Sequence, residues 1–391
     1  MNVFSKPRLA IIGAGQLGMM LCEAARPLGI ETLVITSDAS APALDFADQG
    51  IVKDYFADGL AGQIAREADI VTFEFEAVPA ELLTELQRLQ LESKIEVHPD
   101  AALLRLLQNK AQQKQWLKDH SLPTLPFYAT RTPREEVDAI VELIGLPFVQ
   151  KAQQGGYDGY GVQIIRTRSD LKRLWDTPSM LETYVDNPVE LGVVVARSAK
   201  GQIEIYPPVR MDFKKEQNIL DAIVIPTGFS GEIDAAATQL ARQVVNDLQG
   251  VGVFAIEMFL IDCSELVVNE ISPRVHNSGH HTIECFDVSQ FEQHVRAVCG
   301  MPLRPPEPRH SCAVMRNLLY SDKLEFMLKY PSGISKSHDM DVFVHWYGKT
   351  DPRPGRKMGH ITCLCDDPAE ASELIDSYLD FLSQPQNGAV A

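Results

Sequence analysis

The chain has 391 residues, of which 45% are hydrophobic and 23% are charged, and its formal net charge is −17. This length predicts two or three domains with a sizeable core, and the acidic balance argues against general binding to nucleic acid, whose phosphates would be repelled. The sequence shows no leader pattern, no apolar run of about 20 residues and, among its seven cysteines, neither a disulfide framework nor zinc spacing. We therefore expect a protein of the reducing cytoplasm that does not associate with a membrane.

Strands that alternate with helices are predicted over roughly the first hundred residues. An apolar run at 9–12 is followed by leucines at helical spacing, and further apolar runs lie at 31–38 and 68–76. This alternation indicates an open parallel sheet. A helix is then expected to begin after Asp100, because aspartate commonly caps helix N-termini.

The first glycine-rich loop, "GAGQLG", follows the first predicted strand. Its residues Gly13, Gly15 and Gly18 fit G-x-G-x-x-G, and Asp38 lies near where a ribose-binding acid is expected. The pattern is typical of nicotinamide dehydrogenases. The alternative is that these glycines only permit a tight turn in a domain that binds something else.

A second glycine-rich loop lies at 148–161, "FVQKAQQGGYDGYG". Lys151 ends an apolar strand there and precedes four glycines, whose small size lets backbone N–H groups cradle an anion, at Gly155, Gly156, Gly159 and Gly161. Upstream, Lys110 and Lys114 share one face of a helix predicted over 102–117. We interpret the loop as a phosphate-binding flap, with a flexible surface hairpin and a solvated helix face as the alternatives.

Two glutamates are predicted to face each other in the hairpin "VGVFAIEMFLIDCSELVVNEIS". If Asp262 and Glu265 flank a two-residue turn, Glu257 pairs directly with Glu270. Like charges opposite each other destabilise a ladder, and a magnesium ion held by both carboxylates would offset the repulsion. Asn269 is a further candidate oxygen ligand if the strand ends there. The alternative is that both glutamates lie on a solvated sheet face.

The next stretch, "NEISPRVHNSGHHT", is rich in polar side chains. Its three histidines suggest a metal site, a catalytic loop or a polar turn, and we favour His276 over His280 and His281 as the functional one. After four prolines at 300–310, the last segment is predicted to form short strands. It contains a run of cations that suits an anionic ligand, with a solvated basic loop as the alternative: Lys349, Arg353, Arg356 and Lys357.

Together these motifs resemble the ATP-grasp enzymes and, most closely, the 5-(carboxyamino)imidazole ribonucleotide synthase family, the ATPase subunit of phosphoribosylaminoimidazole carboxylase. The matching strings, in chain order, are "GAGQLG", "FEFEAVP", "GGYDGYG", "GVFAIEMF", "NEISPRVHNSGH", "SQFEQHVRA" and "YGKTDPRPGRKMGH". The resemblance implies a fold of the α/β and α+β classes. It comprises an open parallel-sheet domain at 1–105, an ATP-grasp region at 106–305 with a flap subdomain at about 120–190, and a small β-rich domain at 306–391.

The resemblance also implies a set of functional residues. The ATP-binding residues would be Lys110, Lys151, Gly156, Tyr157, Asp158, Gly159, Tyr160, Gly161, Glu182, Thr183, Tyr184, Val185, Glu190, Asn269 and Glu270. The magnesium ligands would be Glu257 and Glu270, and the catalytic residues Arg274, His276 and Asn277. The acceptor would be bound by Asp158, Ser278, Lys349, Arg353, Arg356 and Lys357.

In this family, ATP and bicarbonate form carboxyphosphate, whose carboxyl group is captured by the amine of aminoimidazole ribonucleotide in purine biosynthesis. ATP and Mg²⁺ are therefore the expected cofactors, these small molecules the expected partners, and a homodimer the expected assembly.

Four positions depart from the family pattern: Met19 replaces an arginine, Val162 a glutamine, and Arg210 and Phe213 occupy a polar segment near the nucleotide. The alternatives are an ATP-grasp ligase with another acceptor or carboxyl donor, such as a formate-dependent transformylase, and a catalytically impaired paralogue.

Overall fold

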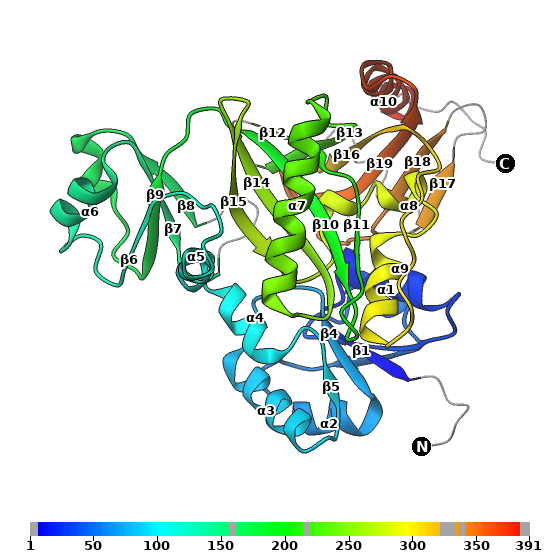
Figure 1. Cartoon of the computed structure of the whole chain (residues 1–391). Helices are drawn as coiled ribbons and strands as arrows, with labels where there is room; N and C mark the ends of the chain where they lie inside the picture. The colour runs from blue at the N-terminus through cyan, green and yellow to red at the C-terminus, as the bar shows by residue number, and fades with distance from the viewer. Residues whose placement is uncertain (1–6, 156–160, 215–218, 321–332, 337–340, 384–391) are drawn as a thin grey trace.

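The computed structural model describes residues 7–155, 161–214, 219–320, 333–336 and 341–383. Within these residues, no helix combines the length and the apolar character that crossing a membrane requires. The described strands assemble into an N-terminal parallel sheet, a small antiparallel sheet and a large central antiparallel sheet (Figure 1).

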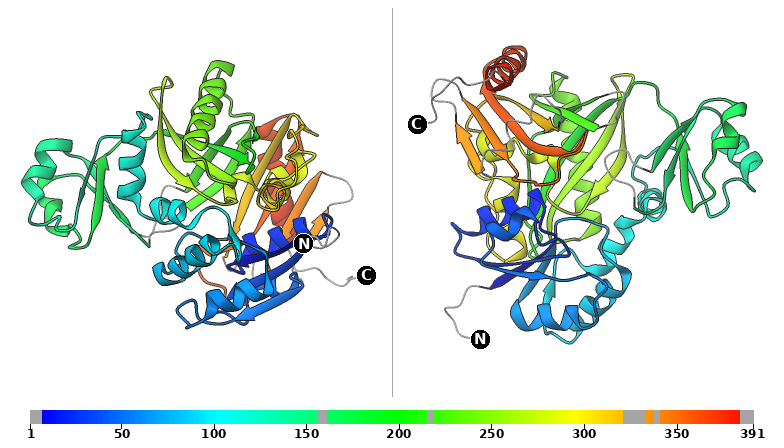
Figure 2. Two further views of the ribbon diagram at one scale, coloured as in Figure 1. Left: turned by 60° about the horizontal axis from the view of Figure 1, so that its bottom comes forward. Right: turned by 180° about the vertical axis from the view of Figure 1, so that it is seen from behind.

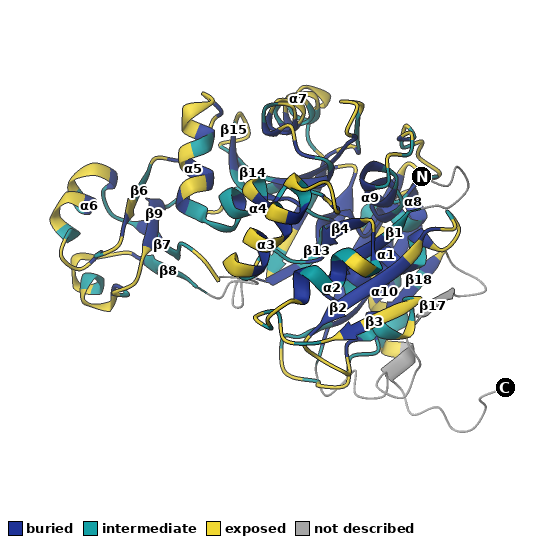
Figure 3. Ribbon diagram, turned by 90° about the horizontal axis from the view of Figure 1, so that it is seen from below, coloured by how far each residue is buried: buried dark blue, intermediate teal, exposed yellow. Residues whose placement is uncertain are grey.

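The N-terminal sheet has the strand order β3-β2-β1-β4-β5 and lies at the bottom of Figure 1. Its parallel pairings confirm the predicted open sheet. Because helices flank the sheet, its strands are largely apolar and appear mostly dark blue in Figure 3. The elements are β1 (Arg8–Ile12), α1 (Gln16–Ala25), β2 (Glu31–Thr36), η1 (Pro42–Asp45), β3 (Gln49–Val52), α2 (Leu60–Glu67), β4 (Ile70–Phe73), α3 (Ala80–Leu91), β5 (Glu96–Val97) and α4 (Ala101–Gln108).

The helix predicted from Asp100 begins there, because the Asp100 carboxylate accepts a backbone hydrogen bond in the first turn of α4. The expectation of one continuous helix is wrong, since Asn109 takes an extended conformation and interrupts it. The Asn109 side chain then accepts a hydrogen bond from the N–H of Gln112 at 3.0 Å. This cap starts α5 (Lys110–Asp119) and places Lys110 at its first position.

The small antiparallel sheet has the order β6-β9-β7-β8 and stands apart from the central sheet in both views of Figure 2. Helix α6 packs on it through the buried side chains of Ile140 and Ile144. The elements are β6 (Phe127–Thr130), α6 (Val137–Ile144), β7 (Phe148–Ala152), β8 (Val162–Ile165), η2 (Arg168–Arg173) and β9 (Ser179–Thr183).

The central sheet has the order β15-β14-β10-β12-β13-β16-β19-β18-β17, with β11 paired to β10. Because β13 pairs with β16, the strands after the proline-rich segment extend the same sheet. The strands are β10 (Val189–Arg197), β11 (Ile203–Ile205), β12 (Val209–Lys214), β13 (Ile219–Ile225), β14 (Gly252–Ile261), β15 (Glu265–Ser272), β16 (Cys312–Leu319), β17 (Gly333–Lys336), β18 (Val342–Trp346) and β19 (Lys357–Cys365).

Helices cover the central sheet with apolar faces at helical spacing. Helix α7 (Gly231–Leu248) buries Ala237, Ala241 and Val244 against β10 and β14, while its outer face is exposed in Figure 3. Helix α9 (Gln290–Val298) lies between the central sheet and α1, in the same apolar cluster as both. The remaining elements are η3 (Asn277–Gly279), α8 (Thr282–Cys285) and α10 (Pro368–Ser383).

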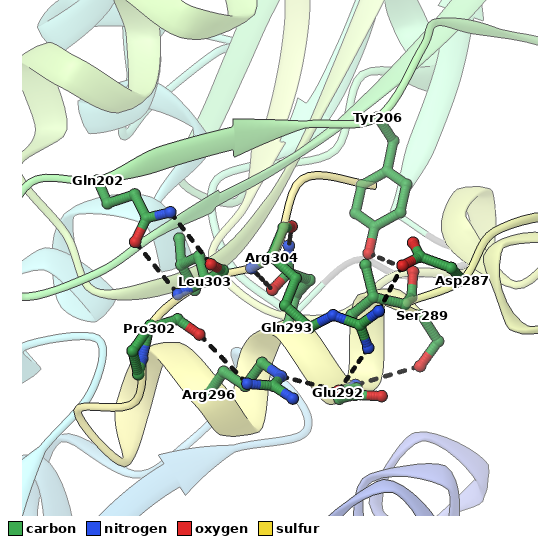
Figure 4. A network of polar contacts seen from close by, with 11 residues as sticks. Gln202, Tyr206, Asp287, Ser289, Glu292, Gln293, Arg296, Pro302, Leu303 and Arg304 are labelled. Atoms are coloured by element: carbon green, nitrogen blue, oxygen red, sulfur yellow. Dashed lines mark hydrogen bonds and ion pairs between the residues drawn. The ribbon is translucent and has the colours of Figure 1, made fainter. Parts of the chain in front are cut away.

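The proline-rich segment at 300–310 contains little regular secondary structure, so side chains satisfy part of its backbone (Figure 4). The amide of Gln202 bonds both backbone groups of Leu303, donating at 3.1 Å and accepting at 3.2 Å. Gln293 bonds both backbone groups of Arg304 in the same way. These paired amides hold the segment against α9 and the central sheet.

Candidate active site

A cleft of about 2060 Å³ opens between the N-terminal sheet, the small sheet and the central sheet. Most of the predicted site residues line it: Lys110, Lys151, Glu182, Thr183, Tyr184, Val185, Glu190, Glu257, Asn269, Glu270, Arg274, His276, Asn277 and Lys357. Five others lie outside the described residues: Gly156, Tyr157, Asp158, Gly159 and Tyr160. Gly161 pairs with the small sheet instead, its carbonyl accepting from the N–H of Ala152 at 2.9 Å.

Glu257 and Glu270 are direct cross-strand partners at one wall of the cleft, as predicted. The predicted two-residue turn is wrong, because Ile261 pairs with Glu265 and leaves a three-residue loop. A bulge at Asn269 adds one unpaired residue to β15 and so compensates for the extra loop residue. Glu257 therefore still pairs with Glu270, although the loop is longer than predicted. The bulge also resolves which way Asn269 points, since its side chain lines the cleft with both carboxylates.

Three lysines contact carboxylate or amide oxygens of this region. Lys110 pairs with Glu270, while Lys151 donates to the amide oxygen of Asn269 at 3.1 Å and pairs with Glu182. The alternative of a solvated helix face is wrong for Lys114, which is 2% exposed and lies 3.1 Å from the Glu182 carboxylate. The Glu182 carboxylate therefore holds the ammonium groups of both Lys114 and Lys151.

Burial and neighbouring charges separate the acidities of these carboxyl groups. Burial, the charge of Glu270 and the charge of Glu190 raise the pKa of Glu257 to about 8. Burial also raises the pKa of Glu190 to about 7. Burial opposes ionisation of Glu182 as well, but Lys151 and Lys114 outweigh it and lower the pKa to about 2. Without a cation, Glu257 is therefore mostly protonated near neutral pH.

The loop 273–280 follows β15 and forms another wall of the cleft. Its Arg274 Nε lies 2.9 Å from the Glu76 carboxylate. His276 accepts a hydrogen bond at Nδ1 from the N–H of Ser278 at 3.2 Å, which leaves Nε2–H facing Glu257 Oε1 at 3.5 Å. The side-chain amide of Asn277 is 9% exposed and has no hydrogen-bond partner among the described residues. An orphaned amide of this kind is suited to a ligand.

The other two histidines of the stretch are buried below this loop. His280 and His281 are each 1% exposed, and burial lowers the pKa of both, that of His281 to about 4. Among the described residues, no group of three His, Cys, Asp or Glu side chains is arranged to hold a metal ion. In the described structure the three histidines of the stretch therefore do not converge on a common position for a metal ion.

The first glycine loop is occupied by a side chain that sequence reasoning did not single out. The Glu74 carboxylate accepts hydrogen bonds from the N–H groups of Gly15 at 2.6 Å and Leu17 at 3.1 Å, at the N-terminus of α1. A Cβ at Gly15 would lie 2.5 Å from this carboxylate. The glycines thus make room for Glu74, and the carboxylate stands where a dinucleotide's pyrophosphate would bind.

A signal for Glu74 exists in the sequence. The string "FEFE" ends the strand next to β1, and carboxyl ends of neighbouring parallel strands meet at one sheet edge. The other overlooked residues are Glu76 and Gln290. They become visible only through contacts between distant segments.

The basic segment reaches the cleft in part. Lys357 lines it, and Lys349 donates to the Lys357 carbonyl at 2.8 Å. Arg356 pairs with the Asp351 carboxylate at 3.0 Å, whereas Arg353 is exposed. Neither arginine lines the cleft, and neither do Lys349 and Ser278.

The four departures from the family pattern have distinct settings. Met19 is 2% exposed in the apolar cluster around α1. Val162 and Phe213 line the cleft. Arg210 also lines it, and its guanidinium makes a two-point contact with the Asp212 carboxylate at 3.0 and 3.2 Å.

Known families match nearly the whole chain. The ribonucleotide synthetase preATP-grasp domain matches residues 7–108, the ATP-grasp domain 115–291 and the phosphoribosylaminoimidazole carboxylase C-terminal domain 313–374. The chain is 34% identical over 366 residues to N5-carboxyaminoimidazole ribonucleotide synthase of Synechococcus elongatus, covering 90% of this chain and 88% of the relative.

The chain belongs to the N5-carboxyaminoimidazole ribonucleotide synthase family.

Solved structures of this family share the fold. The Thermotoga maritima synthetase superposes with a TM-score of 0.81 at 34% identity, covering 95% of this chain and 98% of that one. The Aspergillus clavatus synthase, in complex with ADP and 5-aminoimidazole ribonucleotide, superposes with a TM-score of 0.82 at 29% identity, covering 96% and 98%. The predicted family and fold class are therefore confirmed, and the dehydrogenase alternative is rejected.

Proposed function

We propose that this chain carboxylates 5-aminoimidazole ribonucleotide to its N-carboxyamino form, using ATP and bicarbonate, as a step of purine biosynthesis. One observation carries the assignment: the paired carboxylates of Glu257 and Glu270 share a cleft with two lysines and with the orphaned amide of Asn277. Membership in the synthase family supports the same reaction, as does the A. clavatus relative solved with ADP and 5-aminoimidazole ribonucleotide.

The carboxylates of Glu257 and Glu270, with the amide oxygen of Asn269, fit a magnesium ion. Oxygen donors suit this ion, and the remaining positions of its shell accept water and phosphate oxygens. The pairing of two carboxyl groups across the strands, otherwise unfavourable, supports the assignment. When bound, the ion neutralises charge on the nucleotide's phosphates.

The nucleotide is held by the chain itself along the rest of the cleft. Lys110 and Lys151 move from their present carboxylate partners to the phosphates, where flap residues 156–161 assist them. The backbone of Thr183, Tyr184 and Val185 holds the adenine, and Glu190 accepts hydrogen bonds from the ribose hydroxyls. These residues all line one continuous cleft, apart from the flap.

Chemistry takes place beside the loop 273–280. A bicarbonate oxygen attacks the γ-phosphorus, giving carboxyphosphate and ADP; the acceptor amine then attacks the carboxyl carbon, and inorganic phosphate leaves. Arg274 stabilises the charge that develops on these groups, and Asn277 donates its amide to the carboxyl oxygen. The proton that the amine loses departs through His276.

The acceptor's phosphate is bound by the basic segment and its neighbours. Lys357 lines the cleft and Lys349 is bonded to its carbonyl, which supports their role. Arg353, Arg356, Ser278 and Asp158 complete the proposed acceptor site. By family resemblance we also propose that the enzyme is a cytoplasmic homodimer.

The deciding experiment measures ADP release from Mg-ATP and bicarbonate, with and without aminoimidazole ribonucleotide. Stimulation by the ribonucleotide, with the carboxylated product formed, is expected. Absence of any stimulation would refute the assigned acceptor.

Arg210 and Phe213 on the cleft wall favour a second candidate, an ATP-grasp ligase with a different carboxyl donor or acceptor. A parallel reaction with formate in place of bicarbonate tests the donor. Nucleotide binding without turnover under all conditions would instead identify a catalytically impaired paralogue.

A further inference from the structure

A column of buried rings connects the loop 273–280 to the C-terminal strands. His280, His360 and His345 are each at most 1% exposed. The His280 and His360 ring centroids are 4.7 Å apart, and those of His360 and His345 are 4.1 Å apart with planes tilted by only 9°. None of these three side chains has a part in the proposed chemistry.

At the His280 end, the column is connected through Gln290 to the backbone of His276, a proposed catalytic residue. Gln290 donates to the His276 carbonyl at 2.6 Å and accepts from the His276 N–H at 2.9 Å. The same Gln290 amide lies 3.4 Å from His280 Nδ1. A Cβ at Gly279 would lie 2.5 Å from Gln290, so the loop is closely seated on this amide.

At the other end, His345 and His360 lie in β18 and β19, the strands on either side of the basic segment. His360 Nδ1 bonds the hydroxyl of Tyr347 at 2.7 Å, and His345 Nε2 bonds the Glu284 carboxylate at 2.6 Å. Tyr347 follows β18, and Lys349 lies over its ring at 5.3 Å. His360 lies in β19, whose first residue is Lys357. The column thus joins the loop that activates the carboxyl group to the segment that binds the acceptor.

The energetic setting favours one arrangement of the column. Burial, with the charges of nearby histidines, lowers the pKa of both His280 and His360, so these stacked rings are neutral. Each neutral ring offers one donor and one acceptor, and a contact at Nδ1 restricts its orientation, to Gln290 for His280 and to Tyr347 for His360. Displacement of one ring would therefore disturb both ends.

We propose that His360 is a positioning residue that keeps the loop 273–280 in register with the basic segment, so that the activated carboxyl group reaches the acceptor amine. This proposal rests on the proposed function. It predicts a specific defect: loosening the column leaves ATP cleavage in place and uncouples it from carboxyl transfer.

The test compares His360→Phe, which retains a ring but loses the hydrogen bond, with Tyr347→Phe, which removes only the hydroxyl. His281→Phe is the matched control, because His281 is equally buried on the adjoining segment but its ring packs against Phe286 and not against the column. ADP and carboxylated product are measured in the same reactions, together with the melting temperature of each variant.

His360→Phe and Tyr347→Phe are expected to yield at least threefold less product per ADP than the wild type and to raise KM for the acceptor. His281→Phe is expected to keep the wild-type ratio even if its melting temperature falls. An unchanged ratio in His360→Phe, or equal loss of ADP and product, overturns the proposal.

A substrate-independent measurement separates this inference from the proposed function. Amide hydrogen exchange in peptides covering 273–281 is expected to rise in His360→Phe and not in His281→Phe. If the wild type lacks acceptor-stimulated ADP release, the proposed function fails. The hydrogen-exchange comparison still tests whether His360 positions the loop 273–280, because it needs no substrate. Unchanged exchange in His360→Phe counts against the column as a positioning device.

Discussion

Asn277 shows most directly how a functional residue differs from a structural one. Its amide is buried without a partner, so the folded protein gains no hydrogen bond from it. Asn317 is similarly buried but donates to the Leu220 carbonyl at 2.8 Å. Substitution of the two asparagines is therefore expected to change the free energy of unfolding by different amounts.

Asn277→Leu is expected to leave the free energy of unfolding unchanged or to raise it by about 1 kcal/mol, because an unsatisfied buried polar group is removed. Turnover is expected to fall strongly. Asn317→Leu should instead lose about 1–3 kcal/mol, since it leaves the Leu220 carbonyl unpaired. Urea unfolding and ADP release check both variants; equal destabilisation by the two substitutions would contradict the assignment.

Glu270 is the second residue with a sharply defined role. Glu270→Gln is expected to reduce Mg-ATP turnover at least about 100-fold, because it removes a carboxylate from the proposed magnesium site and the partner of Lys110. Glu265→Gln, at the exposed start of the same strand, is the control and should retain full activity. Near-normal turnover in Glu270→Gln would refute the metal role.

The hairpin of β14 and β15 is the element that assembles the magnesium site. Its three-residue loop places Asp262 and Cys263 at φ of 47° and 56°, in the left-handed region that disfavours side chains. The bulge at Asn269 then restores the facing of Glu257 and Glu270. A strained loop and a bulge are thus needed together for this register.

Cys263→Gly is expected to stabilise the protein by up to about 1 kcal/mol, because glycine adopts the left-handed conformation without steric cost. Cys263→Ala keeps the side-chain restriction and should have little effect. Thermal unfolding of the two variants provides the comparison, and a glycine variant less stable than the alanine variant would contradict the strain.

At the scale of the whole molecule, His294 joins the N-terminal sheet to the central sheet. Its Nδ1 accepts from the N–H of Val253 at 3.0 Å, so its Nε2–H donates to the hydroxyl of Thr72 at 2.7 Å. Burial lowers the pKa of His294 to about 3. The ring is therefore neutral wherever the protein is folded at ordinary pH.

This depressed pKa makes the interface sensitive to acid. Below about pH 6.5 the unfolded chain binds a proton at His294 that the folded chain does not, so the contribution of His294 to stability falls by about 1.4 kcal/mol per pH unit until about pH 3. His294→Gln is expected to be less stable at pH 7.5 but to lose stability less steeply between pH 6 and 4. Urea unfolding across this range tests the difference, and parallel pH profiles would contradict it.

The sequence by itself determined the family and the parallel N-terminal sheet, and most of the site residues that it predicts line the cleft. The sheet follows from apolar runs that alternate with helical spacing, whereas the family rests on the resemblance of long strings such as "NEISPRVHNSGH" to those of known members. Such patterns can be recognised in a single sequence because they do not depend on contacts between distant segments.

Only the tertiary structure decided how these parts work together. The seat of Glu74 on the first glycine loop, the burial of Lys114 against Glu182 and the histidine column all depend on contacts between segments far apart in the sequence. The break at Asn109 and the bulge at Asn269 are likewise set by packing, since a locally favourable helix or register yields when tertiary contacts are worth more.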